Sequence, residues 1–257
     1  MQYLRCLRLC RCLNKELVQH MKYMGSKARH AKELLPIILK DHTPDMWWVE
    51  PFVGGGNMID KVDPQVAPNR LGCDVHEYLI AMWQAVSVGW QAPDDITEEE
   101  YNNIRTNKDN HPKELVGYVG FALSYSGKWW GGWRRDNIGK RNYVDESYRG
   151  TLKQFPKMVG VNFQCTSVFD LDISHIKKAT IYCDPPYAGT TKYKDGFDHE
   201  KFYDWCVDRH KEGHDVFISE YWMPEDRFEC VWQKEVNNSL TKNTGIKKGV
   251  EKLFIVR

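Results

Sequence analysis

The sequence has no long apolar run and little net charge. No stretch approaches the ~20 apolar residues of a membrane-spanning helix, so we predict no membrane contact. The C-x-x-C and H-E-x-x-H spacings are absent, and we predict no metal site. The net charge is +1, so contact with nucleic acid would need a local basic patch. The 257 residues suffice for one domain with an insertion.

The eight cysteines form no evident disulfide framework. Cys6, Cys10 and Cys12 crowd the start of the chain, and the other five are scattered singly, which indicates a reducing compartment. Arginines interrupt the apolar residues of 1–20, so this stretch lacks the continuous apolar region of a secretory signal peptide. We expect residues 1–20 to be a disordered extension or the product of translation from an upstream start codon, with Met21 as the alternative start. A basic amphipathic helix is the other possibility.

Strand and helix patterns alternate along the first third of the chain. Apolar residues predict strands at 46–49 and 70–74. Between them we predict the glycine turn 54–56 and a helix that begins near Asn57. Apolar spacing at 76–86 predicts a further helix. This alternation predicts an α/β fold with a Rossmann-like, mostly parallel sheet.

The pattern is interrupted between residues 93 and 157. Acidic residues at the start of this segment predict the first turn of a helix. The residues that follow are rich in tryptophan, glycine and arginine and show no helical or strand periodicity. We expect an inserted module of helices and loops, flanked by a core domain of 21–92 plus 158–257. The sheet then resumes with strands predicted at 161–165, 179–184, 216–221 and 252–256 and a helix at about 199–210.

The segment C-D-P-P-Y places a carboxylate and a rigid chain at the end of a predicted strand. Asp184 would point into the crevice at the carboxyl edge of a parallel sheet. Pro185 and Pro186 fix their φ angles, so Asp184 and the Pro185 carbonyl form a rigid pair of acceptors. Such a pair suits an amine with two N–H groups, and Tyr187 offers a face for a nucleobase. A turn with a packing tyrosine is the alternative.

The segment E-P-F-V-G-G-G follows the first predicted strand. Its glycines let the backbone approach a ligand, and Asp74 stands twenty positions after Gly54, where an acid binds a ribose in dinucleotide folds. Ile59 replaces the third glycine of G-x-G-x-x-G, so a nucleoside fits better than a pyrophosphate. The alternative is a plain glycine turn with a surface aspartate.

These motifs together resemble the Dam-type (D12 class) adenine-N6 DNA methyltransferases. The resemblance covers nearly all of Met21 to Val256 and rests on Y-M-G-S-K, E-P-F-V-G-G-G, C-D at 74, C-D-P-P-Y and the late V-F-I-S, in the family's order. Tyr23 stands where the family has tryptophan, and Ser26 where it has glycine.

The resemblance implies the S-adenosylmethionine-dependent methyltransferase fold, S-adenosyl-L-methionine as cofactor, and a flipped-out adenine in double-stranded DNA as target. It implies Asp184, Pro185, Pro186 and Tyr187 as catalytic residues. It implies cofactor contacts by Tyr23, Lys27, Phe52, Gly54, Gly56, Asp74, Asp170 and Asp184.

The insertion is where we expect target recognition. Its cations suit phosphates and its planar side chains suit base edges. The candidate DNA contacts are Lys128, Trp130, Arg134, Arg135, Lys140 and Arg141. Trp129 and Trp133 are alternatively the small core of the insert. The loop 241–249 would hold phosphates or be a solvated hairpin. The sequence motifs usual in the family's insertion are absent here, so the resemblance does not imply the family's G-A-T-C target sequence.

Other functions remain open on the sequence. Cytosine-N4 methylation uses the same amine chemistry, and RNA or protein-amine methylation and a catalytically silent DNA-binding regulator share the fold. We expect a monomer or weak dimer in the cytoplasm of a bacterial or phage-infected cell. The compact recognition insert suggests that a phage or prophage encodes the protein. Any restriction endonuclease would be a separate chain.

Overall fold

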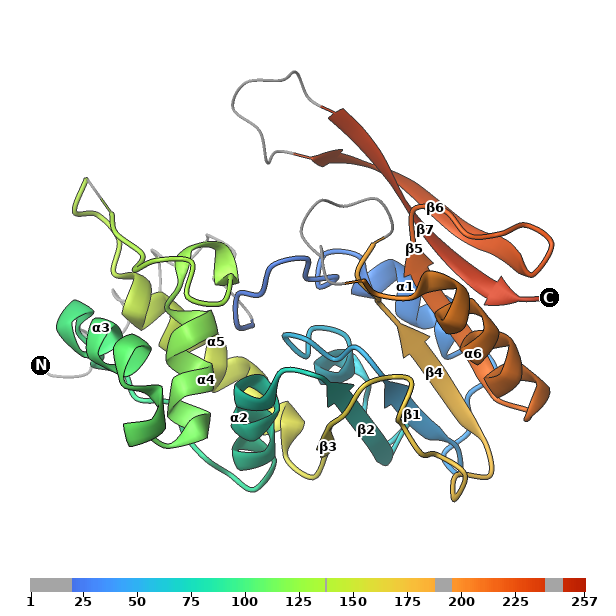
Figure 1. Cartoon of the computed structure of the whole chain (residues 1–257), viewed down its shortest axis with the longest axis horizontal. Helices are drawn as coiled ribbons and strands as arrows, with labels where there is room; N and C mark the ends of the chain where they lie inside the picture. The colour runs from blue at the N-terminus through green and yellow to red at the C-terminus, as the bar shows by residue number, and fades with distance from the viewer. Residues whose placement is uncertain (1–19, 137, 188–195, 239–246) are drawn as a thin grey trace, which may run out of the picture.

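A computed structural model describes residues 20–136, 138–187, 196–238 and 247–257. Within them one seven-stranded sheet has the order β3-β2-β1-β4-β5-β7-β6 (Figure 1). The strands are β1 Trp47–Glu50, β2 Asn69–Asp74, β3 Asn162–Cys165, β4 Ala179–Cys183, β5 Asp215–Glu220, β6 Phe228–Asn238 and β7 Lys247–Val256. The first five strands pair in parallel, and β7 is antiparallel to both neighbours. The predicted α/β fold with a Rossmann-like, mostly parallel sheet is therefore confirmed.

The strand order reverses between β1 and β4. The chain builds outward from β1 through β2 to β3, and then returns to the other side of β1 with β4. The crevice of an open parallel sheet forms at such a reversal, outside the carboxyl ends of the strands. The loops after β1, β2 and β4 therefore have the best position for a ligand site.

Helices cover both faces of the sheet. The described helices are α1 Ala31–Ile38, α2 Glu77–Ser87, α3 Glu98–Thr106, α4 Lys113–Ala122, α5 Tyr143–Gln154 and α6 His199–Lys211, and of these α1, α2 and α6 flank the sheet. Adjacent residues of β1 serve opposite faces, because successive side chains of a strand alternate. Trp48 packs with the cluster of α1 and α2, whereas Val49 packs with the cluster of α6. Both faces are thus buried, as the apolar strands indicated.

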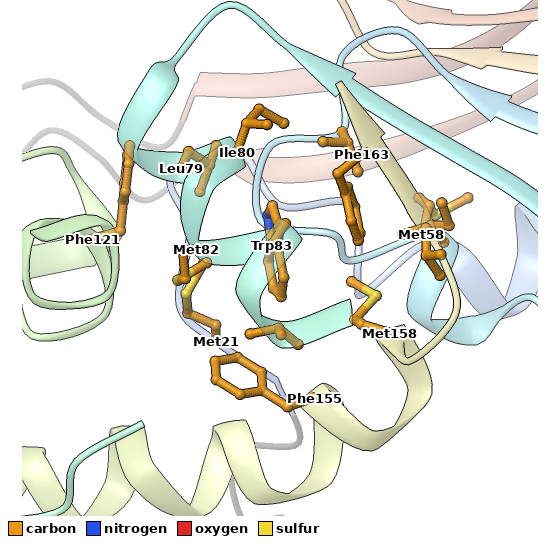
Figure 2. Packing of buried hydrophobic residues seen from close by; sticks show 14 of the residues in the cluster. Met21, Met58, Leu79, Ile80, Met82, Trp83, Phe121, Phe155, Met158 and Phe163 are labelled. Atoms are coloured by element: carbon orange, nitrogen blue, oxygen red, sulfur yellow. The ribbon is translucent and has the colours of Figure 1, made fainter. Parts of the chain in front are cut away.

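The segment between α2 and β3 carries α3, α4 and α5, grouped at the end of the molecule away from β6 and β7 (Figure 1). A capping box of Thr97 and Glu100 begins α3, at the position where the acidic residues predicted the start of a helix. The insert packs on the sheet domain through a shared apolar cluster. Trp83 of α2 lies in it beside Phe155 and Phe163 (Figure 2). The predicted boundaries of 93–157 stay a prediction.

Trp133 packs inside the inserted segment, as one interpretation of the sequence expected, whereas Trp129 packs between this segment and α2. Trp129 lies against Phe121 and Tyr78, with ring centroids 4.8 and 5.6 Å away. Trp133 lies 5.3 Å from the Tyr101 ring. No helix in the described ranges is long and apolar enough to cross a bilayer.

Two elements differ from the sequence prediction. The helix expected near Asn57 is wrong, since only the 3₁₀ turn Ile59–Lys61 forms there. Pro64 follows closely and disfavours helical geometry at the residue before it. The long strand β6 was not predicted, because it is an edge strand whose residues are mostly exposed. A register shift between Cys230 and Trp232 also breaks its alternation.

Two regions of interest lie largely outside the described residues: most of the extension 1–20 and most of the loop 241–249. The strands that flank the second region, β6 and β7, pair as an antiparallel ladder from Asn238 and Lys247 onward.

Candidate active site

The loops after β1, β2 and β4 meet at one edge of the sheet. Val49 of β1 is in register with Leu71 of β2 and with Ile181 of β4. Each of these strands ends within a few residues of that level, so the glycine turn, Asp74 and Asp184 all follow strands at the same edge. The structure thus gathers there the motifs on which the sequence prediction rested.

The glycine turn is shaped by close contact with Tyr23. Gly54 and Gly56 have φ angles of +47° and +64°, in the region that favours glycine. A Cβ on Gly55 would lie 2.4 Å from the Cβ of Tyr23. The Gly54 carbonyl accepts a hydrogen bond from the indole nitrogen of Trp83 at 2.9 Å. Side chains far apart in sequence therefore fix this turn.

Gln154 at the end of α5 ties the insert to the same turn. Its side chain is fully buried, and its amide nitrogen donates to the carbonyls of Gly55 at 2.9 Å and Gly56 at 3.3 Å. Its amide oxygen accepts from the backbone nitrogen of Met21 at 2.7 Å. One side chain thus joins the last helix of the insert, the glycine turn and the segment that leads to Tyr23.

Asp74 connects the turn to β2. Its two oxygens accept from the backbone nitrogens of Gly54 at 3.2 Å and His76 at 2.9 Å. Burial raises the pKa of Asp74, although these N–H groups oppose the rise. Each carboxylate oxygen accepts up to two hydrogen bonds, so capacity remains for two ligand hydroxyls. The neighbouring Val75 is 71% exposed and offers an apolar surface beside them. The carboxylate acceptors fit the ribose hydroxyls of a nucleoside, and the apolar side chain fits its adenine.

Asp184 belongs to a charged group with Lys27 and Glu251. The ammonium of Lys27 lies 3.3 Å from Asp184 Oδ1 and 3.4 Å from Glu251 Oε2. The Lys27 side chain is only 7% exposed. Burial lowers the pKa of Lys27, but the two carboxylates outweigh it and raise the pKa. Burial raises the pKa of Asp184, and Glu251 adds to the rise against the attraction of Lys27.

Tyr187 packs into this group. Its hydroxyl donates to Glu251 Oε2 at 2.9 Å, and the Lys27 ammonium lies 4.4 Å from its ring centroid. The Tyr221 ring meets it edge-on at 4.5 Å. Burial and the nearby carboxylates raise the pKa of Tyr187 well above its usual value. The phenol therefore stays protonated and donates to Glu251.

Glu251 and Tyr221 were not predicted from the sequence. Glu251 lies on β7, sixty-four positions after Tyr187. Tyr221 directly follows β5, in the V-F-I-S-E-Y text. The position of Tyr221 at the end of a predicted strand could have identified it as a site residue. The position of Glu251 depends on the insertion of β7 beside β5 and could not.

Two predicted cofactor residues lie further along the edge. Phe52 packs edge-on against Phe197 and Phe202, with centroids 5.7 and 5.6 Å away. Asp170 is exposed in the loop after β3. That loop is joined to the carbonyl of Asp74 by the backbone nitrogen of Thr166 at 3.1 Å. A role for Asp170 toward the cofactor stays a prediction.

The predicted DNA contacts of the insert have different surroundings. Lys128 and Lys140 are exposed. Arg135 pairs with Glu98, and Arg141 pairs with Glu146. Trp130 is half-buried, with its ring 5.1 Å from Tyr101.

Arg134 is the exception among these cations, because it is buried within the insert. It is 7% exposed and donates to Ser147 Oγ at 2.8 Å. Contact with DNA stays a prediction for all six residues. In the described part of the chain, no group of three or more His, Cys, Asp or Glu is arranged to hold a metal.

Residues 23–119 match the model of the D12 class N6 adenine-specific DNA methyltransferase family. Over these residues the chain is similar to the D12 class. The match includes Tyr23, Lys27, the glycine turn and Asp74. The D12 class comprises S-adenosylmethionine-dependent enzymes, so the predicted family and enzyme type are confirmed.

Solved methyltransferase structures resemble the chain weakly. A provisionally assigned RNA methyltransferase from Pyrococcus horikoshii is 12% identical, with 94% of this chain and 88% of the other covered, at a TM-score of 0.42. An rRNA methylase from Streptococcus thermophilus is 9% identical, with 91% and 98% covered, at a TM-score of 0.38. No curated protein matches the chain.

Proposed function

We propose that the chain transfers a methyl group from S-adenosyl-L-methionine to N6 of an adenine flipped out of duplex DNA. The carrying observation is Asp184, a carboxylate of raised pKa that directly follows β4 and precedes two prolines. The D12 class match supports the same reaction. We also propose action as a monomer or weak dimer in the cytoplasm of a bacterial or phage-infected cell.

The residues at the sheet edge fit the cofactor in charge and in hydrogen-bonding capacity. Asp74 would take the ribose hydroxyls, and the glycine turn with Tyr23 and Phe52 would line the remainder. Bound there, S-adenosylmethionine supplies a methyl group on a positively charged sulfur. Asp184 and Glu251 carry two negative charges against the one positive charge of Lys27. The group therefore favours a neighbouring cation.

Asp184 and the carbonyl of Pro185 would accept the two N–H groups of the target amine. This draws the nitrogen toward tetrahedral geometry and frees its lone pair, which is otherwise delocalised into the base. As the N–C bond forms and the sulfur–methyl bond breaks to leave a neutral thioether, the nitrogen would gain positive charge, and its surplus proton would leave to Asp184 or to solvent. The raised pKa of Asp184 makes it a better proton acceptor.

Tyr187 would hold the base by stacking, which is worth ~1–3 kcal/mol per base. Because its hydroxyl already donates to Glu251, the ring is fixed before a base arrives. Lys27 contacts both the carboxylate and the ring, so it aligns Asp184 with Tyr187.

Replacing Glu251 by glutamine should lower kcat by about tenfold, the effect of one charge-assisted hydrogen bond of ~1.4 kcal/mol. The loss of charge leaves Lys27 paired with Asp184 alone, which withdraws that carboxylate from the amine. Steady-state kinetics with duplex DNA would measure this. The matched control is Glu229→Gln, an exposed glutamate on neighbouring β6, which should leave kcat unchanged. Equal kinetics in the two variants would contradict the role of Glu251.

The reaction itself can be tested with purified protein, tritiated S-adenosylmethionine and unmethylated genomic DNA. Nucleoside analysis should find labelled N6-methyladenine, and Asp184→Ala should remove the label. Labelled N4-methylcytosine would overturn the assignment of the base. Absence of DNA label, with cofactor binding intact by calorimetry, would overturn the DNA substrate.

A further inference from the structure

A hollow on the insert gathers arginines at the start of α5. It is lined by Trp133–Asp136 and by Arg141–Val144. Tyr143 is one of the lining residues, with the guanidinium carbons of Arg134 and Arg141 at 4.2 and 4.8 Å from its ring centroid. The ammonium of Lys22 approaches the same ring at 6.0 Å. Three cations therefore surround one ring.

The acidic side chains near this hollow already accept hydrogen bonds or form ion pairs. Glu146 faces Arg141 at 2.7 Å and Arg134 at 3.8 Å, so two guanidinium groups share its carboxylate. The carboxylate of Asp136 accepts from the backbone nitrogens of residues 138, 140 and 141. Burial and the charge of Arg134 lower the pKa of Lys22, as expected where positive charge is incompletely balanced.

Arg134 carries a buried donor that lacks an acceptor. Its side chain lines the hollow but is only 7% exposed. Nη1 donates to Ser147 Oγ at 2.8 Å, whereas Nη2 finds no hydrogen-bond acceptor among the described residues. Glu146 at 3.8 Å is beyond hydrogen-bond distance. A buried donor left unsatisfied is costly, so the site favours an added acceptor.

The amino end of α5 supplies a further preference for negative charge. Asn142 caps this twelve-residue helix by accepting from the backbone nitrogens of Val144 and Asp145. The positive end of the helix dipole thus opens at the hollow. Two independent features, the unsatisfied guanidinium and the helix end, point to an anion.

We propose that this hollow binds a phosphate group of the DNA backbone, an inference that rests on the proposed DNA substrate. A phosphate oxygen would satisfy Arg134 Nη2, and Arg141 would contact the same group from the exposed side. Lys22 directly precedes Tyr23, so the phosphate would lie near the segment that packs on the glycine turn. Such a contact positions the duplex without reading its sequence.

Arg141→Gln tests the proposal without disturbing the buried arginine. The measurement is the affinity for a fluorescent duplex at several salt concentrations, by anisotropy, without S-adenosylmethionine so that no turnover occurs. We expect weaker binding and a slope of log K against log salt smaller by about 1. Affinity for S-adenosylmethionine, by calorimetry, should not change.

The matched control is Arg149→Gln. Like Arg141, Arg149 is an exposed arginine in an ion pair, here with Asp145, but it lies on α5 and does not line the hollow. Its slope should equal that of the parent. Equal slopes for the Arg141 and Arg149 variants would overturn the phosphate site.

Two further results separate this inference from the proposed function. If Arg141→Gln weakens some duplex sequences much more than others, the hollow reads bases and the phosphate assignment is wrong. If the slope falls as expected but the wild-type protein labels no DNA, the hollow stands and the methylation proposal fails.

Discussion

Asp184→Asn should lower kcat by about 10²–10³-fold, with little change in the KM for DNA. Asparagine keeps the size of the side chain but removes the charge that favours the developing ammonium and accepts its proton, and losses of this size follow removal of one preorganised polar group. Lys27 keeps Glu251 as a partner at 3.4 Å, so the variant should fold. Steady-state kinetics and a thermal melt would measure both properties.

The control for Asp184 is Asp208→Asn. Asp208 is exposed on α6 and is weakly paired with Lys211 at 3.6 Å. Its loss should not affect kcat or stability. If the Asp184 variant keeps the kcat of the wild type while the melt is unchanged, the carboxylate is not the acceptor of the amine and the mechanism is wrong.

Trp83→Ala should lower the free energy of unfolding by about 3–5 kcal/mol, the range for large buried aromatic side chains. Trp83 is fully buried, stacks with Phe163 at 5.9 Å and meets Phe155 edge-on at 5.8 Å (Figure 2). Its truncation leaves a cavity and an unpaired carbonyl at Gly54. Urea unfolding followed by circular dichroism would measure the loss.

Two other variants separate the contributions of Trp83. Trp83→Phe keeps most of the ring volume and should cost less, about 1–3 kcal/mol for the orphaned Gly54 carbonyl. It should also weaken cofactor binding, because the glycine turn loses a tether. Trp222→Ala removes a tryptophan that is 58% exposed and should change stability by less than about 0.5 kcal/mol. Equal losses at positions 83 and 222 would contradict this account of the core.

The sequence predicted those site residues that follow parallel strands. Asp74 and Asp184 each stand at the end of an apolar strand, and a parallel sheet brings such ends to one edge. Glu251 could not be predicted in this way. Its side chain reaches Lys27 because β7 inserts antiparallel between β5 and β6, an order that no local pattern encodes.

The insert shows a second limit of sequence reasoning. A run of cations predicts a basic surface, but it does not tell which cations point inward. Arg134 and Arg135 are neighbours, yet the first is buried against Tyr143 and the second pairs with Glu98 on the surface. Their difference depends on the packing of α5, which brings Ser147 to Arg134.

Helix α5 begins at the arginine hollow and ends at Gln154, whose amide holds the glycine turn. Twelve helical residues span about 18 Å and form a stiff element. Thermodynamic linkage gives this arrangement a consequence that must hold in both directions. If occupancy of one end changes the affinity of the other by some factor, the second ligand changes the affinity of the first by the same factor. Shortening the Gln154 side chain would then decouple DNA and cofactor, so that each binds as if the other were absent.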